Sequence, residues 1–127
     1  MKNMHQCILC IGSNYRAETY MGMAEMLLNQ RFPSIRWGKT VKTLPEGTTC
    51  PTPYLNRAAR LDTNCDADTL RHYFKSIEKT CGRTSLSKQT GIIPLDIDLL
   101  MIDNTVLKPE DMQKHYVRQA LEGLEEK

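Results

Sequence analysis

Hydrophobic residues recur along the chain with two different periods, and these periods predict its regular elements. Apolar residues that alternate with polar ones or form a short run predict strands, whereas apolar residues three and four positions apart predict helices. The predicted strands span residues 4–11, 34–43, 54–62 and 91–102. The predicted helices span residues 17–31, 66–81 and, after Pro109, 110–124.

The first two helices each have a predicted apolar face and a predicted end. In the first helix this face consists of Tyr20, Met23, Ala24, Leu27 and Leu28. In the second helix it consists of Leu70, Tyr73, Phe74, Ile77 and Cys81. Pro33 prevents the first helix from continuing, because proline has a fixed φ and no backbone N–H. Asp66 is the predicted N-cap of the second helix, and Gly82 is placed to end it.

Segments rich in Gly, Pro, Ser, Thr and Asn separate these elements and predict turns and loops. Gly12-Ser13-Asn14 is predicted to be a turn, and residues 83–89 are predicted to be a polar loop. Asn104 marks another predicted turn. Residues 44–53 form a predicted loop whose length favours a role in binding.

The order of the predicted elements is strand, helix, strand, strand, helix, strand and terminal helix. This order predicts an α+β fold, namely a ferredoxin-like βαββαβ sheet with two helices on one face and an extra C-terminal helix. The other face of the sheet is then open to a ligand. Asp96 and Asp98 are expected on that face, with their apolar neighbours facing the helices; these neighbours are Leu95, Ile97, Leu99 and Met101.

Asp96 and Asp98 are the first candidates for chemistry, because they interrupt an apolar strand. Side chains two residues apart on a strand point to the same face, so the two carboxylates lie side by side. Two like charges at that separation call for a compensating cation. A Mg²⁺ ion held by carboxylate oxygens meets that need, and so does a Lys or Arg side chain. Solvated acids on an open sheet face are the third reading, and spacing alone does not separate the three.

Composition narrows the possible classes of protein. A length of 127 residues fits a single domain, 1–127, with one core. The formal net charge of +2 is too small to indicate a nucleic-acid partner or an acidic membrane. No apolar stretch has the length of a membrane span, and the N-terminus lacks a signal-peptide pattern, so a cytoplasmic location is expected.

The five cysteines do not form the pattern of a disulfide framework, because their number is odd and their spacing is scattered. Cys7-x-x-Cys10 has the spacing of a redox or zinc pair, but it lies within an apolar run and no second such pair follows. Both thiols are therefore predicted to lie in the core. A reducing compartment fits this use of cysteine.

Five short motifs, in register with this pattern, resemble the hydroxymethyldihydropterin pyrophosphokinases of folate biosynthesis. They are Gly12-Ser13-Asn14, residues 43–47, residues 53–56, Glu78 with Gly82-Arg83, and residues 95–100. The resemblance covers roughly the first hundred residues. It implies transfer of a pyrophosphoryl group from ATP to the hydroxyl of reduced hydroxymethylpterin, with release of AMP.

The resemblance also implies roles for individual residues. The implied catalytic residues are Asp96, Asp98 and Arg83, of which Asp96 and Asp98 bind two Mg²⁺ ions and Arg83 contacts phosphate. The implied pterin pocket is formed by Thr43, Leu44, Pro45, Tyr54 and Asn56. The implied ATP-binding residues are Glu78, Arg83, Lys88, Leu99, His115 and Tyr116. Small-molecule reactants and a monomer or weak dimer are expected, with no nucleic-acid or membrane partner.

Each of these residues also has a simpler structural reading. Tyr54 suits a strand edge, and Asn56 suits a turn. Arg83 suits the C-terminal end of a helix dipole. Glu78 has possible partners in Lys75 and Lys79. The register of the whole set favours the functional reading over these separate ones.

The chain departs from the family pattern in three places. The family carries Trp and Arg before its acidic strand, where this chain has Thr90 and Ile93. The usual C-terminal part, which includes an aromatic residue that stacks on pterin, is not found in this chain. The loop over residues 83–89 has few basic residues, with Arg83 and Lys88 remaining.

These departures leave open three functions for the chain. The first is the family reaction, with Lys88 in place of the arginine that meets the transferring phosphates. The second is a catalytically weak or inactive relative that binds a pterin, a nucleotide or a protein partner. The third is an enzyme with the same metal-binding platform and a different hydroxylated acceptor.

Overall fold

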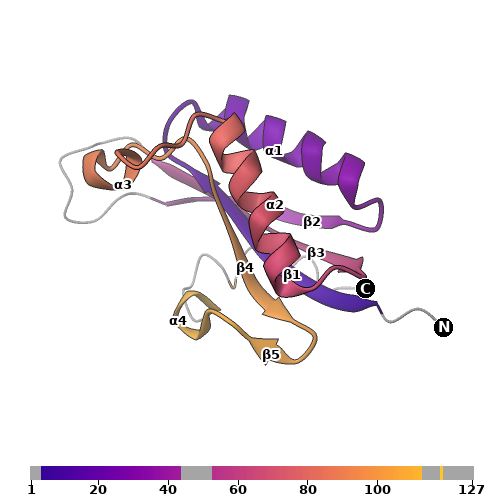
Figure 1. Cartoon of the computed structure of the whole chain (residues 1–127). Helices are drawn as coiled ribbons and strands as arrows, with labels where there is room; N and C mark the ends of the chain where they lie inside the picture. Colours follow the sequence, from indigo (N-terminus) through magenta and orange to yellow (C-terminus); the bar gives the residue numbers. More distant parts are fainter. Residues whose placement is uncertain (1–3, 44–52, 113–117, 119–127) are drawn as a thin grey trace.

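The computed structural model describes residues 4–43, 53–112 and 118 of the chain. The elements in chain order are β1 (His5–Ser13), α1 (Ala17–Arg31), β2 (Arg36–Thr43), β3 (Tyr54–Thr63), α2 (Ala67–Thr80), α3 (Ser87–Thr90), β4 (Asp96–Ile102), β5 (Thr105–Val106) and α4 (Pro109–Met112). The protein is therefore an α+β fold, as the order of predicted elements indicated (Figure 1).

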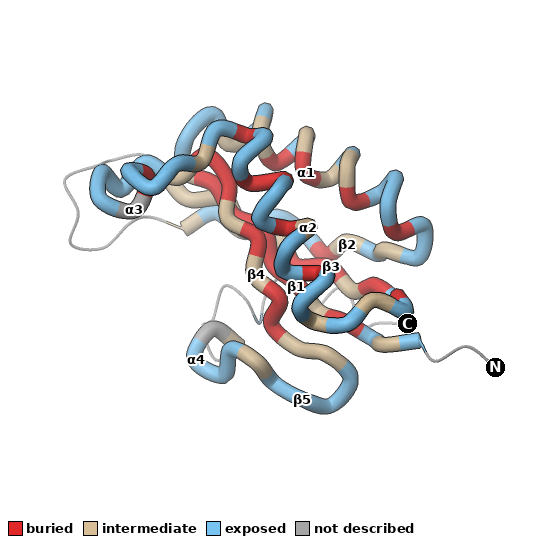
Figure 2. Tube along the Cα trace, viewed as in Figure 1, coloured by how far each residue is buried: buried red, intermediate tan, exposed pale blue. Residues whose placement is uncertain are grey.

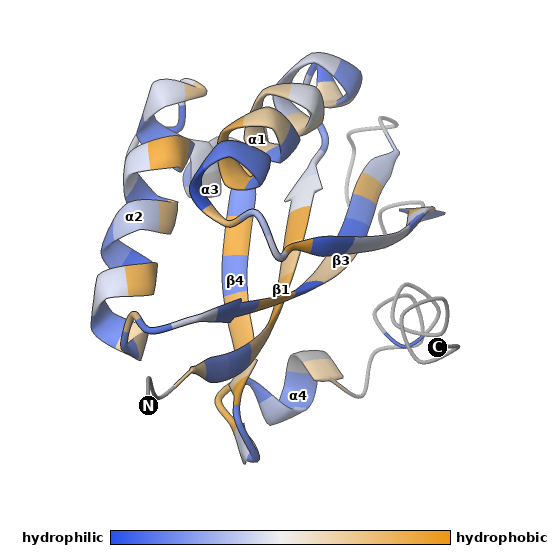
Figure 3. Ribbon diagram, turned by 90° about the vertical axis from the view of Figure 1, so that its right-hand side faces the viewer, coloured by the Kyte–Doolittle hydropathy of each residue, from blue (hydrophilic) through white to orange (hydrophobic). Residues whose placement is uncertain are grey.

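The strands form one antiparallel sheet in the order β2-β3-β1-β4-β5. Helices α1 and α2 lie together on one side of this sheet, and α4 lies on the other side (Figure 3). Strand β1 is central, because it pairs with β3 along one edge and with β4 along the other. Residues far apart in the sequence are thereby brought into one row across the sheet.

The main core fills the space between the sheet and the two long helices (Figure 2). It includes Leu9 and Ile11 of β1, Phe74 of α2, and Ile97 of β4, all at most 3% exposed. A second, smaller cluster lies on the opposite face and consists of Cys10, Ala58 and Leu100, with Ile8, Val41 and Met112 packed against it. The centre of the open face is therefore apolar.

Helices α1 and α2 closely match their predicted spans. Helix α1 has the predicted bounds, although its buried residues are Met21, Ala24 and Leu28. The side chain of Asp66 caps α2 by accepting a hydrogen bond from the Thr69 N–H at 2.9 Å. Gly82 follows α2 with a φ of +94°, a left-handed conformation that glycine adopts without strain. Both predicted helix ends are confirmed.

The predicted faces of the acidic strand are confirmed for three apolar residues and wrong for the fourth. Leu95, Ile97 and Leu99 belong to the main core. The pairing of β1 with β4 shifts between Ile8 and Leu9, so one extra residue enters β4 there. Past this bulge Ile102 packs against the main core, whereas Met101 is paired with Ile8, which packs against the second cluster. The prediction that Met101 faces the helices did not allow for the bulge.

Three other predictions are corrected by the structure. The strand predicted over residues 91–102 begins only at Asp96. Gly12 and Ser13 continue β1 rather than forming a turn, because both residues pair with β3. The predicted polar loop over residues 83–89 contains the start of α3. Of the predicted terminal helix, α4 and Arg118 are described, and the remainder lies outside the described residues.

The cysteines at positions 7 and 10 lie on opposite faces of β1. Cys7 is part of the main core and Cys10 is part of the second cluster, so the prediction of core thiols is confirmed. Burial raises the pKa of the Cys7 thiol to about 11, which keeps it protonated and unreactive at neutral pH. Among the described helices none has both the length and the apolar character to cross a bilayer.

Candidate functional site

A row of residues across three strands forms the base of the candidate site. Gly12 of β1 is paired with Asn56 of β3 on one side and with Asp96 of β4 on the other. Cys10 is similarly paired with Asp98. Directly paired residues in an antiparallel sheet project to the same face. Asp96 and Asp98 therefore lie on the face opposite α1 and α2, as predicted, and Asn56 lies on the same face.

Gly12 allows the Tyr54 ring to lie directly against the backbone of β1. A Cβ atom at Gly12 would come within 2.5 Å of Tyr54 Cε1 and 3.2 Å of Asn56 Oδ1. Any side chain larger than hydrogen at this position would displace the ring or the strand. The absence of a side chain at Gly12 thus brings the aromatic ring and the amide close to the acidic pair.

Tyr54 is held as a neutral phenol at this position. Burial raises the pKa of its hydroxyl well above the usual value, and the negative charge of Asp96 raises it further. The positive charge of Arg83 acts in the opposite direction and is outweighed. Tyr54 therefore offers a flat apolar face and a hydrogen-bond donor at any physiological pH.

Asn56 is 5% exposed and its side chain is hydrogen-bonded to a neighbouring strand. Its Nδ2 donates to Thr43 Oγ1 at 3.4 Å, and the Thr43 hydroxyl donates to the Tyr54 carbonyl at 3.5 Å. Three residues predicted for the pterin pocket are thus in one connected group. The other two, Leu44 and Pro45, lie outside the described residues.

Asp96 and Asp98 are each paired with a basic side chain. Asp96 Oδ1 lies 2.7 Å from Arg83 Nη1, and Asp98 Oδ1 lies 3.5 Å from Lys108 Nζ. In this structure, basic side chains therefore compensate the two acids, which is one of the three alternatives that the sequence left open. Both aspartate side chains remain about one-third exposed, at 32% and 30%, so a ligand can reach them.

The two aspartates also fit the chemistry of a magnesium site. Mg²⁺ is bound in proteins through one or two carboxylates, and its other ligands are water and substrate phosphate oxygens. The described residues contain no group of three or more His, Cys, Asp or Glu side chains that could hold a metal on their own. With two carboxylates as ligands, the other positions around Mg²⁺ would be filled by water and by phosphate oxygens of a substrate.

Glu78 lies beneath the site and is buried, with only 3% of its side chain exposed. Its Oε2 accepts a hydrogen bond from the Ile97 N–H at 2.8 Å and lies 3.7 Å from Arg83 Nη1. Its Oε1 lies 3.5 Å from Lys75 Nζ, which is one of the two partners that the sequence suggested. Glu78 therefore joins α2 to the backbone of the acidic strand and lies beside the Arg83 guanidinium.

Arg83 connects the end of α2 to the start of β4. Its Nη1 donates to the Leu95 carbonyl at 3.3 Å as well as to Asp96. Burial alone lowers the pKa of Arg83, but the hydrogen bond and the charge of Asp96 raise it above the usual value. The guanidinium therefore remains charged at the edge of the acidic pair.

Ser13 and Asn14 have a role that the sequence alone did not reveal. Asn14 Nδ2 donates to the Gly91 carbonyl at 2.7 Å, and Asn14 Oδ1 accepts from the Ile93 N–H at 2.6 Å. The Asn14 N–H also donates to the Ile93 carbonyl at 3.0 Å, and Ser13 Oγ donates to the same carbonyl at 3.4 Å. These bonds attach the segment before β4 to the end of β1. The sequence shows only that an Asn follows the strand. It could not identify the partners of this Asn, because Gly91 and Ile93 lie far away along the chain.

The remaining predicted site residues fall into two groups. Leu99 is buried in the main core, so its side chain lies on the helix side of the sheet rather than beside the aspartates. Lys88 belongs to α3, which precedes β4 at the end of the sheet (Figure 1), and its side chain lies outside what is described. His115 and Tyr116 also lie outside the described residues.

Two glycine substitutions test the close contact at Gly12. We expect Gly12→Ala to destabilise the protein by about 1–3 kcal/mol, because the Tyr54 ring must move to admit the methyl group. Gly22→Ala, inside α1 and with nothing within 4 Å of the added carbon, is expected to stabilise by up to about 1 kcal/mol. Urea unfolding of both variants measures these values. Equal changes in the free energy of unfolding for the two variants would mean that the contact with Tyr54 does not affect stability.

At this end of the open face of an α+β scaffold, two carboxylates, a guanidinium and a phenol lie close together. Over residues 8–126 the chain matches the family model described as 7,8-dihydro-6-hydroxymethylpterin-pyrophosphokinase (HPPK). Because the match spans nearly the whole chain, the protein belongs to the HPPK family, whose members are diphosphokinase transferases of folate biosynthesis. A search of curated proteins finds no match to the chain.

Proposed function

We propose that this protein transfers pyrophosphate from ATP to the hydroxyl of 6-hydroxymethyl-7,8-dihydropterin and releases AMP. The sheet order β2-β3-β1-β4 agrees with a ferredoxin-like platform for this reaction. One observation carries the proposal, namely that Asp96, Asp98, Asn56 and Tyr54 share one end of the open face, with Arg83 bonded to Asp96. This set has groups suited to a metal ion, to phosphate and to a flat heterocycle.

Asp96 and Asp98 are the residues that would hold Mg²⁺. Bound Mg²⁺ would neutralise charge on the phosphate oxygens and favour loss of the hydroxyl proton. The protein itself performs little covalent chemistry in such a transfer, because in-line positioning and charge stabilisation supply most of the acceleration. The rigidity of β4 therefore matters, and the Glu78 bond to the Ile97 N–H supports it directly between the two aspartates.

Arg83 is proposed to meet the phosphates. Within the described residues, its hydrogen bonds and ion pairs all involve Nη1. The Nη2 and Nε donors of the planar fork are therefore the groups proposed for phosphate oxygens. Contacts to Leu95 and Glu78 hold the guanidinium in place, so less conformational entropy is lost when a phosphate binds.

Tyr54 and Asn56 are proposed to position the pterin. The neutral Tyr54 phenol provides a flat face, and Asn56 provides donor and acceptor atoms for the edge of the ring. Thr43 orients Asn56 through the hydrogen bond at 3.4 Å. The proposal includes two Mg²⁺ ions, a cytoplasmic location and a monomer or weak dimer, and the buried thiols of Cys7 and Cys10 agree with a reducing compartment.

A second candidate function is a relative that binds these ligands without turnover. The observation that favours it concerns Ile93, which stands where the family carries an arginine. Ile93 supplies no charge, and both its N–H and its carbonyl are bonded to Asn14. Loss of a positive charge at a transferring phosphate can lower a rate by about three orders of magnitude or more.

AMP formation from ATP and Mg²⁺, measured with and without 6-hydroxymethyl-7,8-dihydropterin, distinguishes the two functions. We expect AMP only when the pterin is present, because the hydroxyl is the acceptor. Binding of ATP and pterin with no AMP at high enzyme concentration would support the non-catalytic relative. AMP formed with a different hydroxylated compound, and not with the pterin, would support an enzyme with another acceptor.

A further inference from the structure

Lys108 is a basic residue that the family resemblance did not assign, and it lies at the acidic pair. Its Nζ is 3.5 Å from Asp98 Oδ1. It belongs to the segment between β5 and α4, which runs back beside β4 after the turn at Asn104. The lysine therefore reaches Asp98 from the C-terminal side of the strand, whereas Arg83 reaches Asp96 from the end of α2.

The backbone around Lys108 is anchored to β4. The N–H groups of Leu107 and Lys108 both donate to the Leu100 carbonyl, at 2.8 and 3.3 Å. The Met112 N–H donates to the Lys108 carbonyl at 3.0 Å and closes the single turn of α4. Lys108 is thus held beside β4 at the level of Leu100, two residues beyond Asp98.

Apolar packing on both sides of Lys108 supports the same placement. Leu107 packs against the main core, and Met112 packs against the second cluster of Cys10, Ala58 and Leu100. The segment therefore has contacts with both faces of the sheet. The position of the lysine follows from burial of its neighbours and not from the ion pair alone.

The ion pair between Lys108 and Asp98 is weak enough for either side chain to change its partner. The two side chains are 47% and 30% exposed, and ion pairs with this exposure contribute little net stability. The lysine ammonium is a compact charge on a flexible four-carbon stem, so it can turn to another anion without movement of its backbone. Asp98 can therefore exchange Lys108 for a metal ion at low cost.

We propose that Lys108 is a nucleotide-positioning residue that compensates Asp98 while no metal is bound and contacts ATP phosphate when Mg²⁺ binds Asp98. This inference rests on the proposed function, since it assumes a metal–nucleotide complex at the acidic pair. It has a specific consequence. Lys108 competes with the metal alone but attracts the nucleotide, so its removal shifts the two affinities in opposite directions.

Two binding titrations on Lys108→Met test this. Mn²⁺ binding without nucleotide is measured by electron paramagnetic resonance, and binding of a non-hydrolysable ATP analogue with Mg²⁺ is measured by calorimetry. We expect Mn²⁺ to bind Lys108→Met roughly 3–10-fold more tightly than the parent, because the competing charge is gone. We expect the analogue to bind roughly 3–10-fold more weakly, because a phosphate contact is lost.

Lys39→Met is the matched control, because Lys39 is an exposed lysine on β2 and the charge change is the same. It is expected to leave both affinities at the parent values, and Lys108→Arg is expected to keep analogue binding. If the parent binds both Mn²⁺ and the analogue, any result for Lys108→Met other than the two opposite shifts overturns the role of Lys108 alone. A parent that binds neither overturns the proposed function together with this inference.

Discussion

Asp96→Asn and Asp98→Asn are each expected to lower AMP formation by about 100-fold or more. The amide keeps the size of the side chain but removes the negative charge that a hard cation requires. Both side chains lie on the open face and are about one-third exposed, so the loss is expected in binding rather than in packing. Initial rates of AMP release, together with calorimetry of an ATP analogue and Mg²⁺, measure the effect.

Asp62→Asn is the control for these two variants, because Asp62 is an exposed acid on β3 and its substitution changes the net charge equally. It is expected to keep the parent rate. The two site variants are expected to unfold within a few degrees of the parent, since Arg83 keeps its contacts to Glu78 and Leu95. Binding of Mg²⁺ and nucleotide by Asp98→Asn at the parent affinity would show that the metal assignment is wrong.

Glu78→Ala is expected to lower the free energy of unfolding by about 3 kcal/mol. The substitution removes the acceptor of the Ile97 N–H in a buried place and takes away a buried partner of Arg83. Unsatisfied buried donors and broken buried ion pairs are among the costliest single changes. In a domain of this size the loss corresponds to a fall in Tm of roughly 10 °C. Denaturant and thermal unfolding, followed by circular dichroism, measure it.

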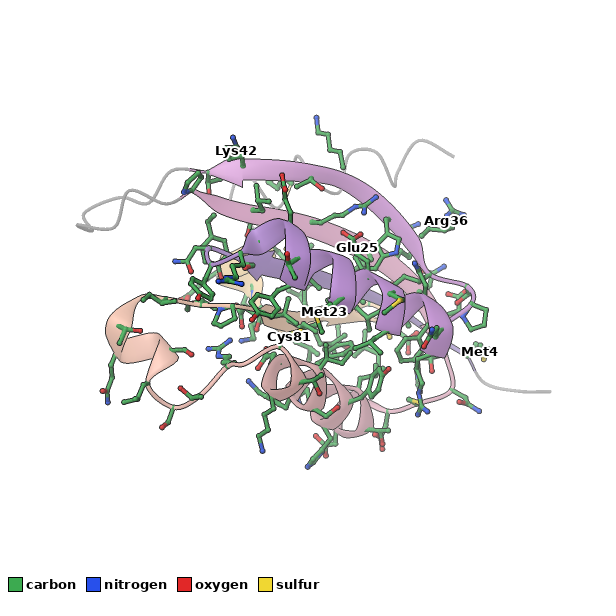
Figure 4. The ribbon with its side chains drawn as sticks, turned by 90° about the horizontal axis from the view of Figure 1, so that it is seen from above. Met4, Met23, Glu25, Arg36, Lys42 and Cys81 are labelled. Atoms are coloured by element: carbon green, nitrogen blue, oxygen red, sulfur yellow. The ribbon has the colours of Figure 1, made fainter. Side chains whose placement is uncertain are left out.

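Glu25→Ala provides the comparison for Glu78. Glu25 projects from α1 toward β2 and β3 (Figure 4) and lies 3.0 Å from Arg57 Nη1, with both side chains about one-quarter exposed. Exposed pairs of this kind contribute less than about 1 kcal/mol. Glu78→Gln keeps an acceptor for Ile97 without the charge and is expected to fall between the two alanine variants. Equal losses for Glu25→Ala and Glu78→Ala would show that burial does not set the cost of losing the carboxylate.

The sequence by itself determined the features that depend on neighbours along the chain. The bounds of α1, the cap at Asp66 and the helix end at Gly82 follow from local backbone preferences, and the structure agrees with all three. The shared face of Asp96 and Asp98 follows from the two-residue period of a strand. Membership of the HPPK family was also accessible, because the motifs are short, ordered and local.

Only the tertiary structure decided the features that depend on pairing between distant segments. Strand register set the bulge that places Ile102 in the core in place of Met101, and it set the close contact of Gly12 with Tyr54. The alternation of one strand carries no information about a shift relative to its neighbour, because the shift is a property of the pair.

The tertiary structure likewise decided which basic residues pair with the two aspartates. Asp96 and Asp98 have the same sequence signature whether a metal, an arginine or a lysine compensates them. Arg83 comes to Asp96 through the packing of α2 on β4, and Lys108 comes to Asp98 through the turn after β4. Electrostatic pairing acts over a few ångströms in space and is independent of separation along the chain, so it becomes defined only when the chain has folded.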